Sequence, residues 1–142
     1  MAAPLQVEIV SPERVLFSGE ADMVITRILS EGEVAFQAGH AAFLGALVEN
    51  HTRIYLTDGN VQDVAVHRGF VEVSGTPTVV SILSDTAELA EEIDVERAKA
   101  ALERHEETLR QQHDDDVLTG AFSGRARAEA RLAATKTGFP GY

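Results

Sequence analysis

Two arginines spaced seven residues apart are the strongest candidates for chemistry in this 142-residue chain. Arg97 and Arg104 fall in a segment with helical periodicity, where seven residues make about two turns, so both guanidinium groups point the same way. Two guanidinium groups on one stripe can fork a polyphosphate. Asp94 begins the same stripe and Glu88 precedes it in the connector. These carboxylates could accept hydrogen bonds from an amino group or from ribose hydroxyls.

The same cluster has a second interpretation that needs no ligand. Glu103 and Glu107 also lie near the two arginines in the sequence. The segment could therefore be a solvated helix with ordinary salt bridges, which contribute little to stability or function. The residues alone leave both interpretations open.

Patterns typical of other sites are missing from the sequence. There is no cysteine, which excludes disulfides, thiol catalysis and zinc–thiolate sites. The chain contains five histidines, none in an i, i+4 metal-binding pair: His40, His51, His67, His105 and His113. His105 falls on an apolar helical face, where a packed histidine is expected rather than a ligand. We therefore predict no metal site and no catalysis by this chain alone.

The overall charge excludes further classes of partner. The chain has 23 acidic and 12 basic side chains, for a formal net charge of −11. Such a balance argues against nucleic-acid binding and against direct binding to anionic lipid. The start of the chain has no signal-peptide pattern, and its apolar runs are far shorter than the roughly 20 residues that cross a bilayer. We therefore expect neither a cleaved leader nor direct insertion into lipid.

The last 26 residues reverse the sign of the charge. Residues 117–142 hold four basic and one acidic side chain. A basic tail on an acidic chain suggests an acidic partner, although a solvated helix with scattered arginines is the alternative.

The first half of the chain has the pattern of an all-β domain. Leu5, Val7 and Ile9 alternate with other side chains, which predicts a strand. Asp58-Gly59 is typical of a tight hairpin turn, because glycine tolerates positive φ. Further strands are predicted at residues 15–17, 22–29, 34–36, 53–57, 61–67, 70–73 and 78–83, with a loop at residues 38–44. Several short strands separated by turns indicate a sandwich or barrel.

The pattern becomes helical after Thr86. Asp94 is a good N-cap for a first helix. One face of that helix carries the apolar positions Ala98, Ala101, Leu102, His105 and Leu109. A polar break at residues 112–116 separates it from a second helix predicted from Val117 to about Thr135.

The second helix has an apolar side that is narrow and rich in alanine. The side is predicted to contain Leu118, Phe122, Ala126 and Ala133. Two glycines, Gly120 and Gly124, weaken the helix by about 1 kcal/mol each relative to alanine. Narrow alanine-rich faces pack closely but weakly, so we expect the helical hairpin to detach readily from whatever it rests on.

Four motifs of the β half share their order with one known family. They are Val-Ser-Pro-Glu-Arg-Val-Leu-Phe-Ser-Gly at residues 10–19, Glu-Gly-Glu-Val with Gly-His-Ala at residues 31–41, Gly-Phe-Val-Glu-Val at residues 69–73, and residues 79–88, which end in Asp-Thr-Ala-Glu. Together they resemble the ε subunit of the bacterial F-type ATP synthase, over essentially the full length of the chain. The set is much more specific than any single motif.

The resemblance implies an α+β fold with two parts. An N-terminal flattened antiparallel β-sandwich is expected over residues 1–86, and a C-terminal α-helical hairpin with a regulatory role over residues 87–142. It further implies a non-catalytic rotor subunit in the central stalk of a proton-translocating ATP synthase. Such a subunit binds γ, rests on the ring of c subunits and lies at the cytoplasmic face of the plasma membrane.

The resemblance also assigns partner-binding residues. Glu33 and His40 match the loop that faces the c-ring in the family. Docked helices would permit ATP hydrolysis, whereas helices extended along γ toward the α and β catalytic subunits would block it. Arg125, Arg127 and Arg131, with Lys136, would then meet an acidic segment of β.

Some members of the family bind ATP on the folded hairpin, through an Ile/Leu-Asp-x-x-Arg-Ala motif with an upstream Glu and a later Arg. The matching residues here are Glu88, Ile93, Asp94, Arg97, Ala98 and Arg104. The resemblance thus implies ATP as a regulatory ligand and requires no other cofactor.

The sequence departs from the family pattern in the loop assigned to the c-ring and in the second helix. In the loop, Ala38 replaces a proline before Gly-His, Ala41-Ala42 replaces Ala-Pro and Ala35 replaces a common glycine, and these changes relax the loop. Gly120 and Gly124 disfavour one long extended helix. The final residues 138–142 have no assigned role.

Two other function classes remain open at the level of the sequence. A stand-alone β-sandwich sensor of adenine nucleotides would bind ATP through Asp94, Arg97 and Arg104 and would not bind γ. A small sandwich enzyme would turn over substrate by itself, and the missing catalytic motif argues against it.

Overall fold

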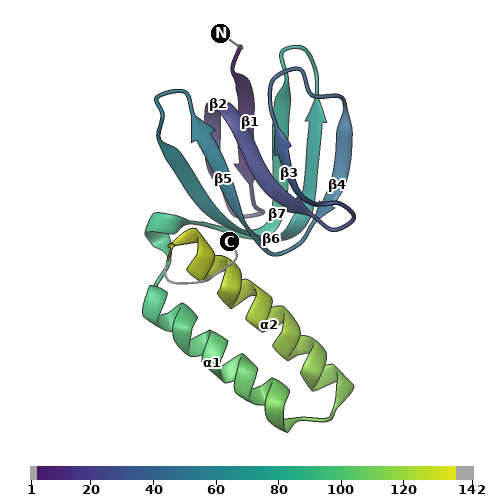
Figure 1. Ribbon diagram of the computed structural model, residues 1–142, viewed down its shortest axis with the longest axis vertical. Helices are drawn as coiled ribbons and strands as arrows, with labels where there is room; N and C mark the ends of the chain where they lie inside the picture. Colours follow the sequence, from purple (N-terminus) through teal and green to yellow (C-terminus); the bar gives the residue numbers. More distant parts are fainter. Residues whose placement is uncertain (1–2, 137–142) are drawn as a thin grey trace.

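Seven strands and a helical hairpin make up the part of the chain that the computed structural model describes, residues 3–136. The strands are β1 (Leu5–Val10), β2 (Val15–Ile28), β3 (Gly32–Phe36), β4 (Phe43–Leu47), β5 (Asn50–Leu56), β6 (Val61–Ser74) and β7 (Val79–Leu89). A short 3-10 helix, η1 (Ala90–Glu92), leads to α1 (Val95–Gln111) and α2 (Asp115–Ala134). The strands form one body and the two helices project from one of its ends (Figure 1). The predicted α+β fold is confirmed.

The strands form a sheet that folds back on itself. Their order is β1-β7-β6-β4-β2-β3, β5 pairs with both β2 and β6, and β1 also pairs with β2. All pairings are antiparallel except the parallel pair β1–β7. This closure leaves the sheet with one apolar interior, as in the expected flattened sandwich.

Alternating side chains fill that interior. Leu5, Val7 and Ile9 of β1 are fully buried, as their spacing predicts. Phe36 is the largest of the fully buried side chains, and Ile82 on β7 is buried with it in the same apolar cluster. The hairpin predicted at Asp58-Gly59 is also present, between β5 and β6.

Two pairs of predicted strands are in fact single long strands. Residues 15–17 and 22–28 belong to β2, which ends one residue before the predicted end, because the supposed break at Ser18 and Gly19 is held straight by pairing with Glu8 and Val7 of β1. Residues 61–67 and 70–73 both belong to β6, which bends rather than ends at Gly69. Gly69 has φ of +126°, and a Cβ there would lie 1.9 Å from the Leu83 carbonyl oxygen, so only glycine fits the bend.

Other predicted boundaries shift by several residues. The predicted loop at residues 38–44 ends earlier, because Phe43 and Leu44 pair with β6 as the start of β4. Strand β5 begins at Asn50 rather than Arg53. Strand β7 continues to Leu89 because its last residues pair with β6, so Glu88 lies in a strand and not in a connector. The boundary expected after residue 86 falls inside this strand.

Each helix of the hairpin begins with an aspartate N-cap, as predicted. The Asp94 side chain accepts a hydrogen bond from the backbone N–H of Arg97, and Asp114 accepts from two N–H groups at the start of α2. Only residues 112–114 separate the helices, which therefore run antiparallel and pack along their length.

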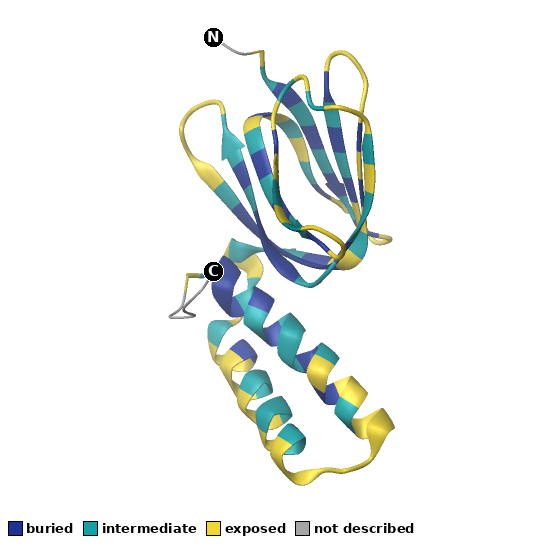
Figure 2. Cartoon of the chain, turned by 45° about the vertical axis from the view of Figure 1, so that its right-hand side comes forward, coloured by how far each residue is buried: buried dark blue, intermediate teal, exposed yellow. Residues whose placement is uncertain are grey.

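The buried face of α2 differs from the predicted one. Of the predicted residues Ala133 is buried, but Phe122 is 52% exposed, and the buried stripe runs through Ala121, Gly124, Ala128 and the last turn of the helix. The prediction followed the largest side chain, whereas close helix–helix packing favours the small ones. Figure 2 shows that burial on α2 increases toward the sandwich, while the outer side of α1 is exposed.

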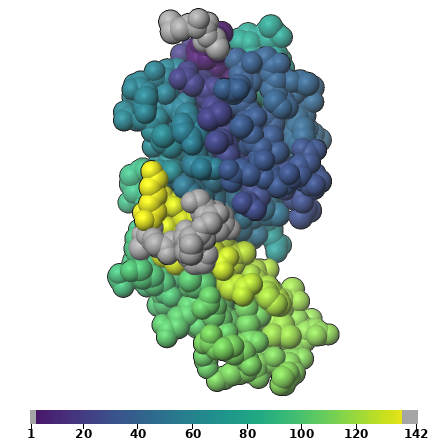
Figure 3. Space-filling view, in the orientation of Figure 1, coloured from purple at the N-terminus to yellow at the C-terminus, as the bar shows by residue number. Residues whose placement is uncertain are grey.

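The hairpin rests on the sandwich mainly through α2, which packs against β5 and β6. The space-filling view shows the two helices below the β half, at the end opposite the N-terminus (Figure 3). Within residues 3–136, three polar side-chain contacts join α2 and its C-terminal end to the sandwich. Arg131 pairs with Glu88 at 2.7 Å, the Arg68 guanidinium donates to the Ser123 hydroxyl at 3.1 Å, and Lys136 lies 3.5 Å from Asp63.

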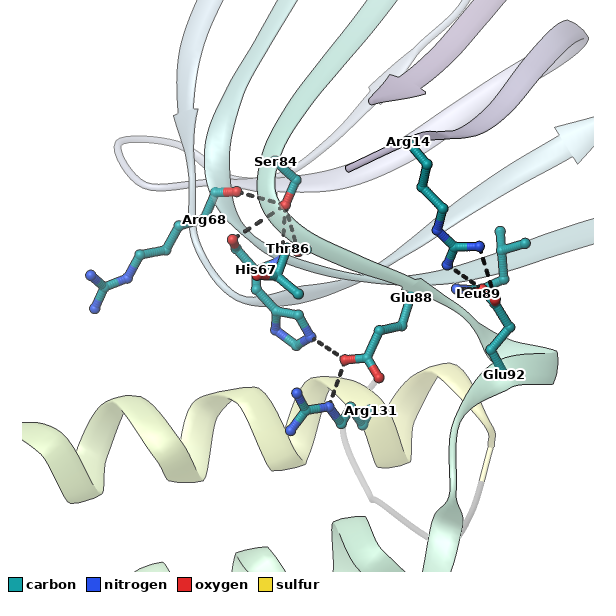
Figure 4. A network of polar contacts seen from close by, with 9 residues as sticks. All are labelled: Arg14, His67, Arg68, Ser84, Thr86, Glu88, Leu89, Glu92 and Arg131. Atoms are coloured by element: carbon teal, nitrogen blue, oxygen red, sulfur yellow. Dashed lines mark hydrogen bonds and ion pairs between the residues drawn. The ribbon is translucent and has the colours of Figure 1, made fainter. Parts of the chain in front are cut away.

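Glu88 is the central group of this contact. Its Oε1 accepts hydrogen bonds from the Nε2 of buried His67 at 3.0 Å and from the Nε of Arg131 at 2.7 Å (Figure 4). The bond from His67 is the main cause that lowers the pKa of Glu88 to about 2; burial opposes the shift and Arg131 adds to it. Glu88 is therefore a carboxylate at neutral pH.

The two glycines of α2 have different environments. Nothing lies within 4 Å of a Cβ at Gly120, whereas a Cβ at Gly124 would lie 2.3 Å from the His105 imidazole. We expect Gly120→Ala to raise the free energy of unfolding by about 1 kcal/mol, since alanine is the better helix former. We expect Gly124→Ala to lose that gain, because the imidazole must move.

Urea unfolding of both variants in wild-type and His105→Ala backgrounds checks this difference. In the His105→Ala background the two alanine substitutions should become equally stabilising. Equal effects in the wild-type background would contradict the packing of His105 on Gly124.

The lowered pKa of Glu88 predicts a specific loss of stability in acid. A carboxyl whose folded pKa is about 2, against an ordinary 4.5, stabilises the fold above pH 4.5 and loses this contribution as the pH falls toward 2. Between pH 5 and pH 3 the wild type should therefore lose about 1–2 kcal/mol more than Glu88→Gln, which has no carboxyl to protonate.

Unfolding by urea at the two pH values measures this difference. Glu96→Gln, which alters an exposed carboxylate on α1, is the matched control and should follow the wild type. Parallel pH profiles for the wild type and Glu88→Gln would show that Glu88 does not hold the hairpin in place.

Candidate functional site

A cavity of about 510 Å³ lies between the two helices and the end of β7. All six residues predicted to bind ATP line it: Glu88, Ile93, Asp94, Arg97, Ala98 and Arg104. The structure thus brings together groups that are up to 16 positions apart in the sequence. Arg127 and Arg131 of α2 line the same cavity.

The antiparallel hairpin places these arginines. Arg97 and Arg104 lie two turns apart on α1, as predicted, and Arg127 and Arg131 lie one turn apart on α2. Because the loop between the helices is short, positions at similar distances from it face each other. Four guanidinium groups from two helices therefore converge on one cavity.

Three of these four arginines have no carboxylate partner. The chain has twelve Lys and Arg side chains, and nine of them form ion pairs within 4.0 Å. Within residues 3–136, which include all twelve, only Arg97, Arg104 and Arg127 form neither an ion pair nor a side-chain hydrogen bond. Guanidinium groups that line one cavity without a carboxylate partner have the chemistry to bind an anion.

The acidic residues around the cavity are already engaged. Glu88 is held by His67 and Arg131. Glu92 makes two hydrogen bonds with Arg14, at 2.6 and 2.9 Å, and this pairing lowers its pKa. The Asp94 side chain caps α1 by accepting a hydrogen bond from the backbone N–H of Arg97. These carboxylates leave the three unpaired arginines uncompensated.

His105 also lines the cavity, between Arg104 on its own helix and Arg127 on α2. Burial lowers the pKa of His105, and the two arginines lower it further, because each disfavours a second positive charge. The ring packs on Gly124. The predicted packed position is correct, but the side chain also reaches the cavity.

The two residues predicted to face the c-ring lie on the sandwich. Glu33 on β3 pairs with Arg53 at 2.6 Å and with Arg27 at 3.7 Å. His40 lies in the loop after β3, with its ring 4.9 Å from the ring of Phe36. Glu33 is therefore fixed by two cations, and His40 by an aromatic contact.

The three arginines predicted to contact the β subunit do not share one surface in this conformation. Arg125 pairs with Glu129 at 3.6 Å and lies over the Phe122 ring at 5.3 Å. Arg127 and Arg131 face the cavity. The end of the basic tail, residues 138–142, lies outside the described residues.

Sequence reasoning missed several members of the site: Arg14, His67, Glu92, and the inward placement of His105, Arg127 and Arg131. One available signal was the i, i+4 spacing of Arg127 and Arg131, which puts both on one face of a helix that must pack antiparallel to α1. His67 and Arg14 could not be found this way, because strand pairing and the path of η1 bring them close.

Among residues 3–136 no group of three or more His, Cys, Asp or Glu side chains could hold a metal ion. Within the same residues, neither helix combines the length and apolar character needed to span a bilayer.

Comparisons with known proteins point to one family. Residues 4–90 match the family model described as ATP synthase, Delta/Epsilon chain, beta-sandwich domain. An ATP synthase epsilon chain of Shouchella clausii is 38% identical over 130 residues, which cover 92% of this chain and 88% of the relative. The epsilon chain of Thermobifida fusca is 44% identical over 135 residues, covering 93% and 92%.

A solved structure supports the fold over both parts of the chain. A chain of the Euglena gracilis mitochondrial ATP synthase (OSCP/F1/c-ring) superposes with a TM-score of 0.82 and 24% identity, covering 94% of this chain and 82% of that chain. The family resemblance predicted from the four sequence motifs is thereby confirmed by independent matches of sequence and fold. From its β-sandwich match and its full-length relatives, the chain belongs to the epsilon chain family of ATP synthases.

Proposed function

We propose that this chain is a non-catalytic rotor subunit in the central stalk of a proton-translocating ATP synthase, where its β-sandwich couples γ to the c-ring. Membership of the epsilon chain family carries this proposal. Two solved structures of similar fold come from an F1/c-ring assembly and from a central stalk/c-ring assembly; the second superposes with a TM-score of 0.63. The proposed location is peripheral, at the cytoplasmic face of the cell membrane.

An apolar area on the outside of the sandwich supports docking of γ. Phe70 and Leu83 face each other across β6 and β7 and are 56% and 52% exposed. Leu44 on neighbouring β4 is 71% exposed, and by strand alternation it lies on the same face. Clustered exposed apolar side chains are typical of a protein interface. Glu33 and His40 remain the proposed contacts with the c-ring.

We further propose that the cavity binds ATP as a regulatory ligand. The observation that carries this proposal is the set of three unpaired arginines, Arg97, Arg104 and Arg127. Guanidinium groups bind phosphate oxygens in bidentate fashion and keep their charge at all physiological pH values. Glu88 and Asp94, with Ile93 and Ala98, are the proposed contacts for the nucleoside.

ATP bound in this cavity would favour the docked hairpin. The cavity is built from α1, α2 and β7 together, so it exists only while the hairpin is folded onto the sandwich. A ligand that binds one conformation stabilises it in proportion to the logarithm of its concentration over Kd. Without ATP, the arginines repel one another and the hairpin is released to inhibit hydrolysis at the catalytic subunits, where Arg125, Arg127 and Arg131 contact β.

A stand-alone nucleotide sensor is the second candidate, and the same cavity favours it. The two candidates differ in γ binding. A sensor would bind ATP tightly and would not associate with γ, whereas the rotor subunit binds γ whether or not ATP is present.

Removal of α2 and the tail tests the rotor and its regulation together. A chain of residues 1–116 should still co-purify with γ in a reconstituted complex, because the apolar outer face of the sandwich is intact. The complex should hydrolyse ATP faster than one with the full chain, because the inhibitory element is gone.

Each of the two measurements has a result that would contradict the proposal. Absence of γ binding by the full chain at micromolar concentration would refute the rotor function. Unchanged hydrolysis with the truncated chain would show that the hairpin is not an inhibitor here.

Single arginine substitutions test the nucleotide site. Arg97→Ala or Arg104→Ala should weaken ATP binding about ten- to a hundredfold, since each removes a charge-assisted hydrogen bond worth about 1.5–3 kcal/mol. Arg110→Ala is the matched control on the same helix, because Arg110 pairs with Glu107 outside the cavity.

Titration calorimetry of the isolated full chain with ATP gives the dissociation constants. The control should bind ATP as the wild type does. Equal affinities for the wild type, Arg97→Ala and Arg104→Ala would exclude the cavity as the ATP site.

A further inference from the structure

We propose that His105 is a protonatable phosphate contact in the cavity, so that ATP binding takes up a proton and tightens as the pH falls. The proposal rests on the ATP site proposed above and adds a specific form of regulation to it. Three observations support it: the position of the imidazole, the lack of hydrogen-bond partners for its nitrogens within the described residues, and the charges around it.

The imidazole is fixed between the two helices. His105 projects from α1 toward Gly124 of α2, where a Cβ would come within 2.3 Å of its Cε1 and Nε2 and 2.7 Å of its Nδ1. The bare backbone of Gly124 is thus what makes room for the ring. Since both residues line the cavity, the ring is held at its wall.

Both ring nitrogens are available to a ligand. Within residues 3–136, His105 has no hydrogen bond or ion pair. Three other histidines have such partners: His40 with the Ala41 carbonyl, His51 with Asp63 and His67 with Glu88. His105 is thus a half-buried imidazole on a cavity wall with its polar atoms unused.

The charges that face the cavity come from every element around it. On α1 they are Asp94, Arg97 and Arg104; on α2 they are Arg127 and Arg131; on β7 and η1 they are Glu88 and Glu92. The two glutamates are neutralised by Arg131 and Arg14. The empty cavity is therefore positive around His105 and favours the neutral imidazole.

A polyphosphate in the cavity reverses this preference. Phosphate oxygens placed among Arg97, Arg104 and Arg127 bring negative charge next to the ring, and an opposite charge close by favours the protonated form. A protonated His105 can then donate a hydrogen bond to a phosphate oxygen, as the arginines do. Its proton comes from solvent, and at most one proton is taken up for each ATP bound, the fraction depending on the pH.

The sign of the pH dependence follows from this proton uptake. Between the pKa of His105 in the empty cavity and its higher value in the complex, affinity rises as the pH falls, by at most about tenfold per pH unit. ATP would hold the hairpin docked more firmly in mildly acidic conditions than in alkaline ones. The arginines stay charged throughout and contribute no such dependence.

The test is ATP affinity at pH 6, 7 and 8 for the full-length wild type and for His105→Gln, measured by titration calorimetry. Glutamine retains a polar side chain and cannot take a proton. The terminal phosphate of ATP also titrates in this range, but it is common to the two measurements. The ratio of the two affinities therefore isolates His105.

We expect the wild type to gain about three- to tenfold more affinity than His105→Gln between pH 8 and pH 6. A second measurement, the NMR titration of the His105 Cε1 proton, should show a higher pKa with saturating ATP than without it. This readout uses the wild type alone, so it does not depend on how well the variant folds.

The outcomes separate this proposal from the one on which it rests. Suppose that ATP binds, that the ratio of the wild-type to the His105→Gln affinity is the same at every pH, and that ATP does not change the His105 titration. This result would overturn the role of His105 and leave the ATP site standing. Absence of ATP binding at every pH would overturn both.

Discussion

Three arginines without carboxylate partners, Arg97, Arg104 and Arg127, are the feature on which the proposed behaviour of the C-terminal half depends. Within residues 3–136 the nine other cations are paired with carboxylates, whereas these three line one cavity without such a partner. Like charges held close together destabilise the conformation that confines them unless an anion enters. The proposed ATP response rests on this arrangement, because an anion in the cavity would supply the negative charge that the three arginines lack.

The rest of the docked interface is suited to release. The buried stripe of α2 is rich in alanine and glycine, so its burial contributes modest apolar area. Glu88 lies at the centre of its polar contacts to the sandwich, where it bridges buried His67 and Arg131. The other two polar contacts involve the exposed side chains of Arg68 and Lys136, and contacts of this kind contribute little to stability. The proposed ATP response requires a hairpin held in this way, by a narrow apolar stripe and one buried bridge.

The sequence predicted the parts of this account that depend on local pattern. Alternation identified β1, the cap at Asp94 located α1, and the spacing of Arg97 and Arg104 placed both at one cavity. Errors arose where tertiary contacts override local preference: strand pairing carries β2 through Gly19, and close helix packing buries Gly124 and leaves Phe122 exposed. The contribution of Arg127 and Arg131 to the cavity required knowing how α2 lies on α1.

The most direct test of the account is the distance between the hairpin and the sandwich with and without ATP. Because the chain has no cysteine, two introduced ones, Glu20→Cys and Thr119→Cys, can carry spin labels on exposed positions of β2 and α2 without side reactions. The account predicts one narrow distance distribution with saturating ATP and a broader, shifted one when ATP is removed. An unchanged distribution in a protein that demonstrably binds ATP would contradict it.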